Sequence, residues 1–501
     1  MKIRIISTSD VHGNVMPINY ANNAYVNQGF LSIINSIQKY KVDNTLIIDN
    51  GDTIHGSPFT TYYYEHKDNN INPINLCLKE YDYVNIGNHD FSYGKKEIKK
   101  YIEDLGNKYL CGNVKIDGIN YGKEYIIHEF DEANKVAIIG CVSRCVLTYE
   151  SKEHVEGVEI EDCYEYCKRV IEKIKRIEDV KATIIVYHGG LEADFNGQLI
   201  EDDTGENQGY RMCKELDFDI LISGHQHRSF ATTLFNKVVT QCTANGKEFA
   251  MIDYDLDNKK VNYELIKPEG YDKDLYNKLI PLEDEVQKWL DEPIGIIKNV
   301  NLKINDEFSA RLYKRPLISF INEVQKQLVN ADLSGVALFN GAVGFNQEIS
   351  IRDLVSTYIY QNNIYKVKIN GKQLKQYLEV NANYFDIHNN NIVVSDDYLK
   401  PVERHFNYDM VDGIDYTIKV SNPRGKRIID LKYNNIDVKE TDKFTLAISN
   451  FRYGGSGGFD VLKGLEIIQK SDEDMVNVLI KYLKKNKETI VKHKNNIKVI
   501  V

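Results

Sequence analysis

The stretch IRIISTSDVHG, residues 3–13, reads as an apolar strand that runs directly into Asp10, His12 and Gly13. A carboxylate and an imidazole two residues apart can bind a metal ion, and the glycine lets the chain turn sharply beside it. Taken alone, such a pair is usually no more than a turn. The stretch is informative because the same arrangement recurs along the first half of the chain.

Four further apolar runs end in the same kind of polar turn. They are LIIDN before Gly51-Asp52, VNI before Gly87-Asn88-His89, IIVY before His188-Gly189-Gly190, and DILIS before Gly224-His225-Gln226-His227. In open α/β sheets, ligands bind outside the carboxyl ends of the strands. The five turns are therefore predicted to converge on one crevice.

The chain has 501 residues, which is too long for a single core. Through residue 265, strand-like runs alternate with helical segments such as EYCKRVIEKIKRI (residues 165–177), which predicts an α/β layered domain. Residues 266–304 are charged and helical in pattern and are predicted to form a helical linker. Residues 305–501 then form a second domain with both helix and strand patterns.

The polar turns supply more donors than one ion needs. A tetrahedral ion takes four ligands, whereas a set of seven suits two ions that share a bridging carboxylate. Mixed nitrogen and oxygen donors admit Mn, Fe, Co or Zn. The seven predicted ligands are Asp10, His12, Asp52, Asn88, His188, His225 and His227.

In their order along the chain, DVHG, GD, GNHD, HGG and GHQH resemble the motifs of the calcineurin-like metallophosphoesterases. This resemblance implies a four-layer fold and two divalent ions that generate a hydroxide for in-line attack on phosphate. It assigns one ion to Asp10, His12, Asp52 and His227, and the other to Asp52, Asn88, His188 and His225, with Asp52 bridging.

The resemblance gives His89 a catalytic role rather than a ligand role, beside the phosphate or the leaving oxygen. In the 5′-nucleotidases its carboxylate partner lies four residues after the asparagine, and that position here is Ser92. Asp90 is expected to cap the following helix or to bond backbone at its N-terminus. His55 is expected to be a surface residue or to lie just behind the site.

The second half resembles the C-terminal domain of the 5′-nucleotidase group, an α+β substrate-binding domain. The stretches concerned are ISIRDLVSTYIYQNNIYKVKINGKQLKQYLE (349–379), FNYDMVDGIDYTI (406–418) and AISNFRYGGSGGF (447–459). Within that group the chain is most similar to the bifunctional 2′,3′-cyclic-nucleotide 2′-phosphodiesterase/3′-nucleotidases. Two aromatic rings sandwich the base in the group, and Phe451 and Tyr408 match them, with Phe406 in place of Tyr408 if the register slips. The alternative is that these rings belong to the core.

Two departures bear on the substrate. Gly457 stands where 5′-nucleotidases carry an aspartate for the ribose hydroxyls, and Asn340 opens an NGAVGF segment that lacks their arginine. The loss of an anionic group suits a phosphate on the 2′,3′ edge of the ribose. Asn340 and Gly457 are therefore predicted to face the substrate, together with the two aromatic rings.

The predicted activity is opening of 2′,3′-cyclic nucleotides to 3′-nucleotides, followed by release of nucleoside and phosphate. A 5′-nucleotidase or nucleotide-sugar hydrolase is the enzymatic alternative. A non-catalytic nucleotide-binding protein is the other alternative, and a missing ligand would favour it, but none of the seven is missing.

The charge and hydropathy of the chain exclude some classes of binding partner. The net charge of −10 disfavours polymeric nucleic acid as a partner. The sequence has no apolar run of 18 residues and no visible signal peptide, so we expect no membrane span and a cytoplasmic protein, or an exported one if this is a mature chain. The oligomeric state is not readable from the sequence, and the eight cysteines are expected to be reduced and mostly buried.

Overall fold

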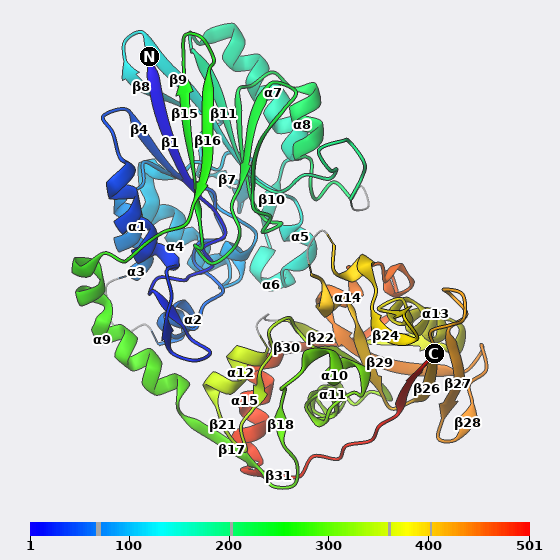
Figure 1. Ribbon diagram of the computed structural model, residues 1–501. Coiled ribbons are helices and arrows are strands. Elements are labelled where there is room, and N and C mark those ends of the chain that lie inside the picture. Colours follow the sequence, from blue (N-terminus) through cyan, green and yellow to red (C-terminus); the bar gives the residue numbers. More distant parts are fainter. Residues whose placement is uncertain (67–71, 201–203, 359–361, 401–402) are drawn as a thin grey trace. The chain divides into compact units, whose positions relative to one another are not determined.

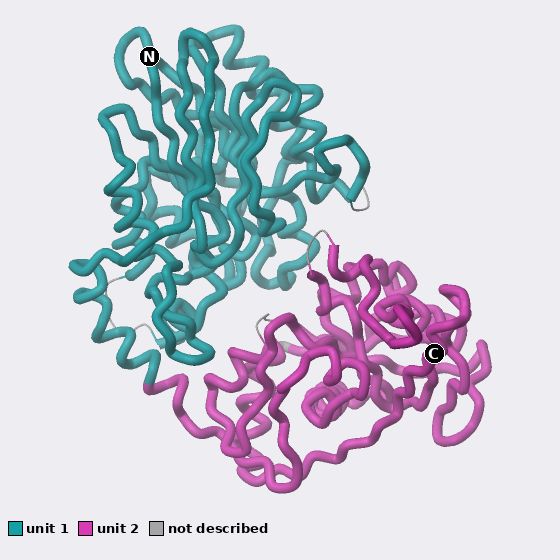
Figure 2. Tube along the Cα trace, viewed as in Figure 1, with its two compact units in different colours: residues 1–287 teal, residues 288–501 magenta. Residues whose placement is uncertain are grey.

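The computed structural model describes residues 1–66, 72–200, 204–358, 362–400 and 403–501. The chain forms two compact units, Met1–Gln287 and Lys288–Val501, which Figure 2 shows in different colours. Their boundary falls within helix α9, Lys273–Leu290.

The predicted helical linker, residues 266–304, is only partly helical. Its last part forms β17 (Pro293–Ile297) and β18 (Leu302–Lys303). Strand β17 pairs with β21 (Glu348–Ser350) and β31 (Glu488–Thr489), both in the second unit. The reason is local: the charged pattern ends before Ile294 and Ile297, and these two side chains are buried.

The first sheet of unit 1 combines parallel and antiparallel strands. In order across the sheet they are β16 (Val261–Ile266), β15 (Phe249–Asp255), β1 (Lys2–Thr8), β4 (Thr45–Asp49) and β5 (Tyr83–Val84). Strands β1, β4 and β5 run parallel, so their carboxyl ends lie at one edge of the sheet.

The second sheet of unit 1 has a parallel centre. In order its strands are β13 (Phe230–Leu234), β14 (Lys237–Gln241), β12 (Ile220–Ser223), β11 (Ala182–His188), β9 (Asn134–Val142) and β8 (Ile126–Asp131). Strands β9, β11, β12 and β14 are parallel to one another.

The predicted four-layer architecture is confirmed. Apolar side chains from both sheets form one core between them, including Ile5 and Ile48 from the first sheet and Ile184 from the second. Helices α7 (Cys163–Ile177) and α8 (Gly209–Glu215) cover the outer face of the second sheet through another core (Figure 1).

Helix α1 (Gly29–Tyr40) covers the outer face of the first sheet, and the ring of Tyr40 contacts Phe249 of β15. Its buried residues include Phe30, Ile33 and Ile37, which recur at the helical spacing of one apolar face. Periodicity in the sequence therefore accounts for how this layer packs.

Unit 2 is built on a mixed sheet. In order its strands are β25 (Asp409–Asp412), β19 (Leu333–Ala337), β29 (Lys443–Ser449), β22 (Asn363–Asn370) and β30 (Ile467–Asp474). Helix α11 (Pro316–Val329) lies against it, and the Gln325 amide on this helix donates to the carbonyls of Gly335 and Ala447. A four-stranded sheet follows, with β28 (Ile436–Asp437), β27 (Ile428–Tyr433), β26 (Asp415–Lys419) and β32 (Ile497–Ile500).

Among the described residues, no helix combines the length and the apolar character that crossing a membrane requires. All eight cysteines are buried and carry free thiols.

Candidate metal centre

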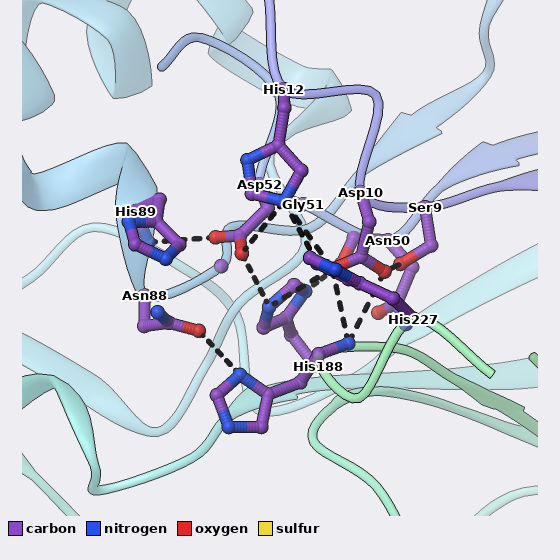
Figure 3. Close-up of polar contacts among 12 residues, drawn as sticks. Ser9, Asp10, His12, Asn50, Gly51, Asp52, Asn88, His89, His188 and His227 are labelled. Atoms are coloured by element: carbon purple, nitrogen blue, oxygen red, sulfur yellow. Dashed lines mark hydrogen bonds and ion pairs between the residues drawn. The ribbon is translucent and has the colours of Figure 1, made fainter. Parts of the chain in front are cut away.

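The seven predicted ligands come together at the carboxyl ends of five strands, β1, β4, β5, β11 and β12 (Figure 3). His12 Nε2 lies 3.0 Å from His227 Nε2, and His227 Nε2 lies 3.4 Å from Asp10 Oδ1. His188 Nε2 lies 3.2 Å from Asp52 Oδ2. His225 Nδ1 lies 2.7 Å from Asn88 Oδ1. Every predicted ligand therefore has another predicted ligand within 3.4 Å.

The backbone that presents these groups is strained. Five of the seven residues have left-handed φ angles, which non-glycine residues seldom adopt: Asp10 (56°), His12 (50°), Asp52 (53°), His225 (71°) and His227 (56°). Each such residue costs on the order of 1–3 kcal/mol, and strain of this kind concentrates at functional sites. No side-chain pattern in the sequence shows it.

The turns after β4 and β5 pack directly against each other. A Cβ on Gly87 would lie 2.2 Å from Asp52 Oδ1 and 2.6 Å from His188 Cε1. A Cβ on Gly51 would lie 2.2 Å from the Gly87 nitrogen. Both glycines are therefore required for the close approach that brings Asp52 to His188.

His188 and Asp52 present unpaired atoms to each other. His188 Nδ1 lies 2.7 Å from the carbonyl of Asn50 and donates its hydrogen there, which leaves Nε2 as a lone pair in the neutral ring. Both His188 Nε2 and Asp52 Oδ2 are buried without a hydrogen-bond partner among the described residues. Although burial opposes it, the carboxylates of Asp52 and Asp10 raise the pKa of His188 to about 9. A proton and a divalent cation would therefore compete for the same gap.

His12 is also arranged as a ligand. Its Nδ1 lies 3.1 Å from the His55 carbonyl and donates to it, so Nε2 faces His227, Asp52 at 3.8 Å and Asp10 at 4.0 Å. Burial lowers the pKa of His12 to about 3, which keeps the ring neutral and its Nε2 lone pair available.

The donor sets fit two cations. Asp10, His12 and His227 form one group with ligand atoms within 4.8 Å, and Asp10, Asp52 and His188 form another. Carboxylate and imidazole donors of this kind suit Mn, Fe, Co or Zn. Asp10 belongs to both groups. Asp52 Oδ2 likewise lies near a histidine of each group, 3.8 Å from His12 Nε2 and 3.2 Å from His188 Nε2, so both carboxylates are within reach of both groups.

His225 is held from both sides. Its Nδ1 lies 2.7 Å from Asn88 Oδ1, and its Nε2 lies 2.7 Å from Oε1 of Glu206. Sequence reasoning missed Glu206, because it follows no apolar run and carries no motif.

The expectation that Asp90 caps the following helix is wrong. Its Oδ1 accepts from the backbone nitrogens of Thr53 (2.8 Å) and Ile54 (2.9 Å), and its Oδ2 from those of Gly87 (2.7 Å) and Asp52 (3.0 Å). The buried carboxylate therefore joins the two ligand-bearing turns. Helix α4 (Lys95–Leu105) begins only after Gly94, so Asp90 lies too far before its first turn to cap it. The carboxylate accepts instead from backbone amides of the two turns.

His89 borders the site without entering either donor group. Its backbone nitrogen donates to Asp52 Oδ1 at 2.7 Å, and its half-exposed ring lies 5.3 Å from the ring of His12. His55, which is 6% exposed, stacks on it at 5.8 Å and is thus not a surface residue. Ser92 occupies the position of the expected carboxylate partner, and its hydroxyl donates to Glu150 at 2.5 Å. A carboxylate from another segment therefore lies next to this turn.

In unit 2, the assignment of Tyr408 as a base-stacking ring is wrong. Tyr408 is fully buried, and its ring stacks on Tyr384 at 4.7 Å. Phe406, the other register, is half-buried and lies 6.4 Å from the half-buried ring of Phe451. The 3-10 turn His405–Asn407 explains the difference, because it places Phe406 outside the strand that begins at Asp409.

A buried ion pair holds these two aromatic segments together. Arg452 Nε donates to Asp409 Oδ2 at 2.7 Å, and Arg452 Nη2 donates to the carbonyl of Phe406 at 2.9 Å. Arg452 Nη1 donates to the carbonyl of Ser456 in the glycine-rich loop at 2.6 Å.

Gly457 is exposed and has a φ of +84°, and a Cβ there would lie 2.5 Å from Asn407 Oδ1. A side chain is therefore excluded from this position by the fold of the loop. Phe345, at the position of the missing arginine, is fully buried. Asn340 donates to the Glu403 carbonyl at 3.0 Å and lines a cavity of about 250 Å³.

The same cavity is lined by Arg311 of α10 (Glu307–Leu312), whose Nη2 donates to the Leu338 carbonyl at 2.8 Å. A guanidinium therefore lies beside Asn340 although residue 345 is phenylalanine.

Comparison with known families and proteins finds similarity in both units. Residues 3–229 match the calcineurin-like phosphoesterase family, and residues 293–464 match the 5′-nucleotidase C-terminal domain. The trifunctional nucleotide phosphoesterase protein YfkN of Bacillus subtilis is 26% identical over 99% of this chain, which spans 38% of the Bacillus protein. The 2′,3′-cyclic-nucleotide 2′-phosphodiesterase/3′-nucleotidase of Salmonella typhimurium is 24% identical over 90% of this chain and 81% of its own length.

Among solved structures, a candidate 5′-nucleotidase from Staphylococcus aureus in complex with alpha-ketoglutarate is similar over the whole of both chains, with a TM-score of 0.89 and 28% identity.

Proposed function

Because the chain combines a calcineurin-like phosphoesterase domain with a 5′-nucleotidase C-terminal domain, we propose that it hydrolyses 2′,3′-cyclic nucleotides and 3′-nucleotides in a metal-dependent reaction. The products are nucleoside and phosphate. The observation that carries the proposal is the convergence of seven ligands on five strand ends, with unpaired atoms of His188 and Asp52 facing each other at 3.2 Å.

The predicted ligands of unit 1 would bind two metal ions. Asp10, His12, Asp52 and His227 would hold one ion, and Asp52, Asn88, His188 and His225 would hold the other, with Asp10 also within reach of both. When bound, two divalent cations lower the pKa of a water molecule and neutralise the phosphate charge. His89, half-exposed at the border of the site, would donate a hydrogen bond to the phosphate or a proton to the leaving oxygen.

Unit 2 would hold the nucleoside. Phe406 and Phe451 offer half-buried rings on which a base can stack, an interaction worth about 1–3 kcal/mol for any base. Arg452 fixes the carbonyl of Phe406 and that of Ser456, so both aromatic segments keep their positions when no base is bound.

The 2′,3′ preference rests on Gly457. Its φ of +84° and the 2.5 Å approach to Asn407 leave no room for the aspartate that binds ribose hydroxyls in 5′-nucleotidases. An anion that would repel a 2′- or 3′-phosphate is therefore absent from this position. The name of the Salmonella relative points to the same substrate class.

Phosphate release from 2′,3′-cAMP, 3′-AMP and 5′-AMP in the presence of Mn²⁺ tests the proposal. We expect the first two to be hydrolysed faster than 5′-AMP. Equal or faster release from 5′-AMP would favour a 5′-nucleotidase instead. Asn88→Ala should abolish release from all three, whereas Asn196→Ala, at an exposed position, should leave the rates unchanged.

A further inference from the structure

The two ring nitrogens of His225 both face hydrogen-bond acceptors. Nε2 lies 2.7 Å from a carboxylate oxygen of Glu206, and Nδ1 lies 2.7 Å from the amide oxygen of Asn88. A neutral imidazole carries only one N–H, and an ionised carboxylate can only accept. The hydrogen on Nε2 therefore pairs with Glu206, and the lone pair of Nδ1 points toward Asn88, where a cation can lie between nitrogen and oxygen.

Glu206 is itself fixed in place. The hydroxyl of Tyr149 donates to its Oε2 at 2.6 Å. Its backbone carbonyl accepts from the hydroxyl of Ser143 at 2.6 Å and from that of Tyr187 at 3.1 Å. Tyr187 belongs to β11, the strand that ends in His188, and Ser143 directly follows the neighbouring strand β9. The backbone of Glu206 is thus anchored to β11, whose last residue is the predicted ligand His188, and to the end of the neighbouring strand β9.

The alternative role for Glu206 is as a ligand of a separate ion, together with Cys145 and His225. Cys145 Sγ lies 3.9 Å from His225 Nε2, and the ligand atoms of Cys145, Glu206 and His225 lie within 4.8 Å of one another. This group could hold an ion of its own only if His225 released the hydrogen that it donates to Glu206. It would then have to bind cations through both ring nitrogens, as an imidazolate.

We propose that Glu206 is a positioning residue of the second metal site, which accepts the Nε2 hydrogen of His225 and so presents Nδ1 to the ion shared with Asn88. This inference rests on the proposed function, because it assumes that His225 is a metal ligand. Carboxylates that hold a metal-bound histidine in this way are typically worth 10- to 100-fold in metal affinity.

The test is Mn²⁺ binding to the full chain, measured by calorimetry, with circular dichroism to establish folding. Glu206→Ala should weaken one of two binding events 10- to 100-fold and leave the other unchanged. Glu206→Gln keeps an oxygen that can accept from Nε2, so it should lose less affinity than Glu206→Ala. Glu206→Met, whose side chain has a similar length but no such acceptor, decides the question if Glu206→Ala does not fold.

Cys145→Ser is the matched control, and we expect it to bind both ions as the wild type does. Wild-type affinity for both ions in Glu206→Ala, or in Glu206→Met if that variant decides, would overturn the proposal. Loss of a bound ion in Cys145→Ser would also overturn it, in favour of a separate site. The binding measurement uses Mn²⁺ alone and so does not depend on the substrate. If Glu206→Ala bound Mn²⁺ more weakly but the wild-type chain did not hydrolyse 2′,3′-cAMP, the proposed function would be wrong and the role of Glu206 would stand.

Discussion

Replacing Asp90 with asparagine should weaken the hydrogen bonds that connect the two turns carrying Asp52 and Asn88. The carboxylate accepts four buried backbone N–H groups, two on each oxygen: Thr53 and Ile54 on Oδ1, and Asp52 and Gly87 on Oδ2. Asparagine keeps one oxygen, so two of the four amides face an NH₂ group instead. A buried donor without an acceptor costs about 1–3 kcal/mol. Asp90→Asn should therefore cost about 2–6 kcal/mol.

Hydrogen–deuterium exchange of the peptides that contain residues 50–54, with urea unfolding in parallel, would measure this cost. Burial and the charge of Asp52 raise the pKa of Asp90 to about 6, so the comparison belongs at pH 8, where the carboxylate is ionised. A loss of 2 kcal/mol corresponds to about 30-fold faster exchange. Asp82→Asn is the matched control, because exposed Asp82 accepts from the Ile47 nitrogen at 2.8 Å, and asparagine can keep that bond.

We expect the control to remain within about 0.5 kcal/mol of the wild type. If Asp90→Asn exchanged and unfolded like the control, the argument that Asp90 joins the two turns would be refuted.

Removal of metal with a chelator should lower the unfolding temperature of the chain, and Mn²⁺ at about 100 times its Kd should restore about 2.7 kcal/mol, measured by calorimetry. Phe406→Ala should raise KM for 3′-AMP roughly 5- to 150-fold, the equivalent of about 1–3 kcal/mol. Tyr408→Phe should leave KM unchanged, because the buried hydroxyl has no hydrogen-bond partner in the described part of the chain. Gly457→Asp should lower the unfolding temperature without creating 5′-AMP hydrolysis, since its side chain would meet Asn407. Burial raises the pKa of Asp49 to about 7, so the folded chain holds a proton that the unfolded chain releases near pH 4. Stability should fall as the pH rises from about 4 to 7, and urea titrations should show a weaker fall in Asp49→Asn.

The fold of the first unit and the convergence of the seven residues predicted as ligands could be predicted from the sequence, for a local reason. Each ligand follows an apolar run by only a few residues, and parallel strands bring their carboxyl ends to one edge of a sheet. The spacing within DVHG or GHQH is therefore enough to place a side chain at the crevice. Helical periodicity, as in α1 and α7, likewise places the outer layers.

The residues that brace the site were not predictable, because their partners are distant in the chain. Asp90 binds amides 36 to 38 residues earlier, and Glu206 reaches a histidine 19 residues later across a turn without any motif. In the same way, Phe406 and Tyr408 are equally aromatic and only two residues apart. A 3-10 turn leaves one half-buried, and packing on Tyr384 buries the other completely.

The sequence by itself determined which chemical groups gather at the strand ends, since that depends on short-range order along each strand. Only the tertiary structure decided which groups hold those ligands in position and which ring is available to a base. Both depend on burial and on hydrogen bonds between segments far apart in the chain.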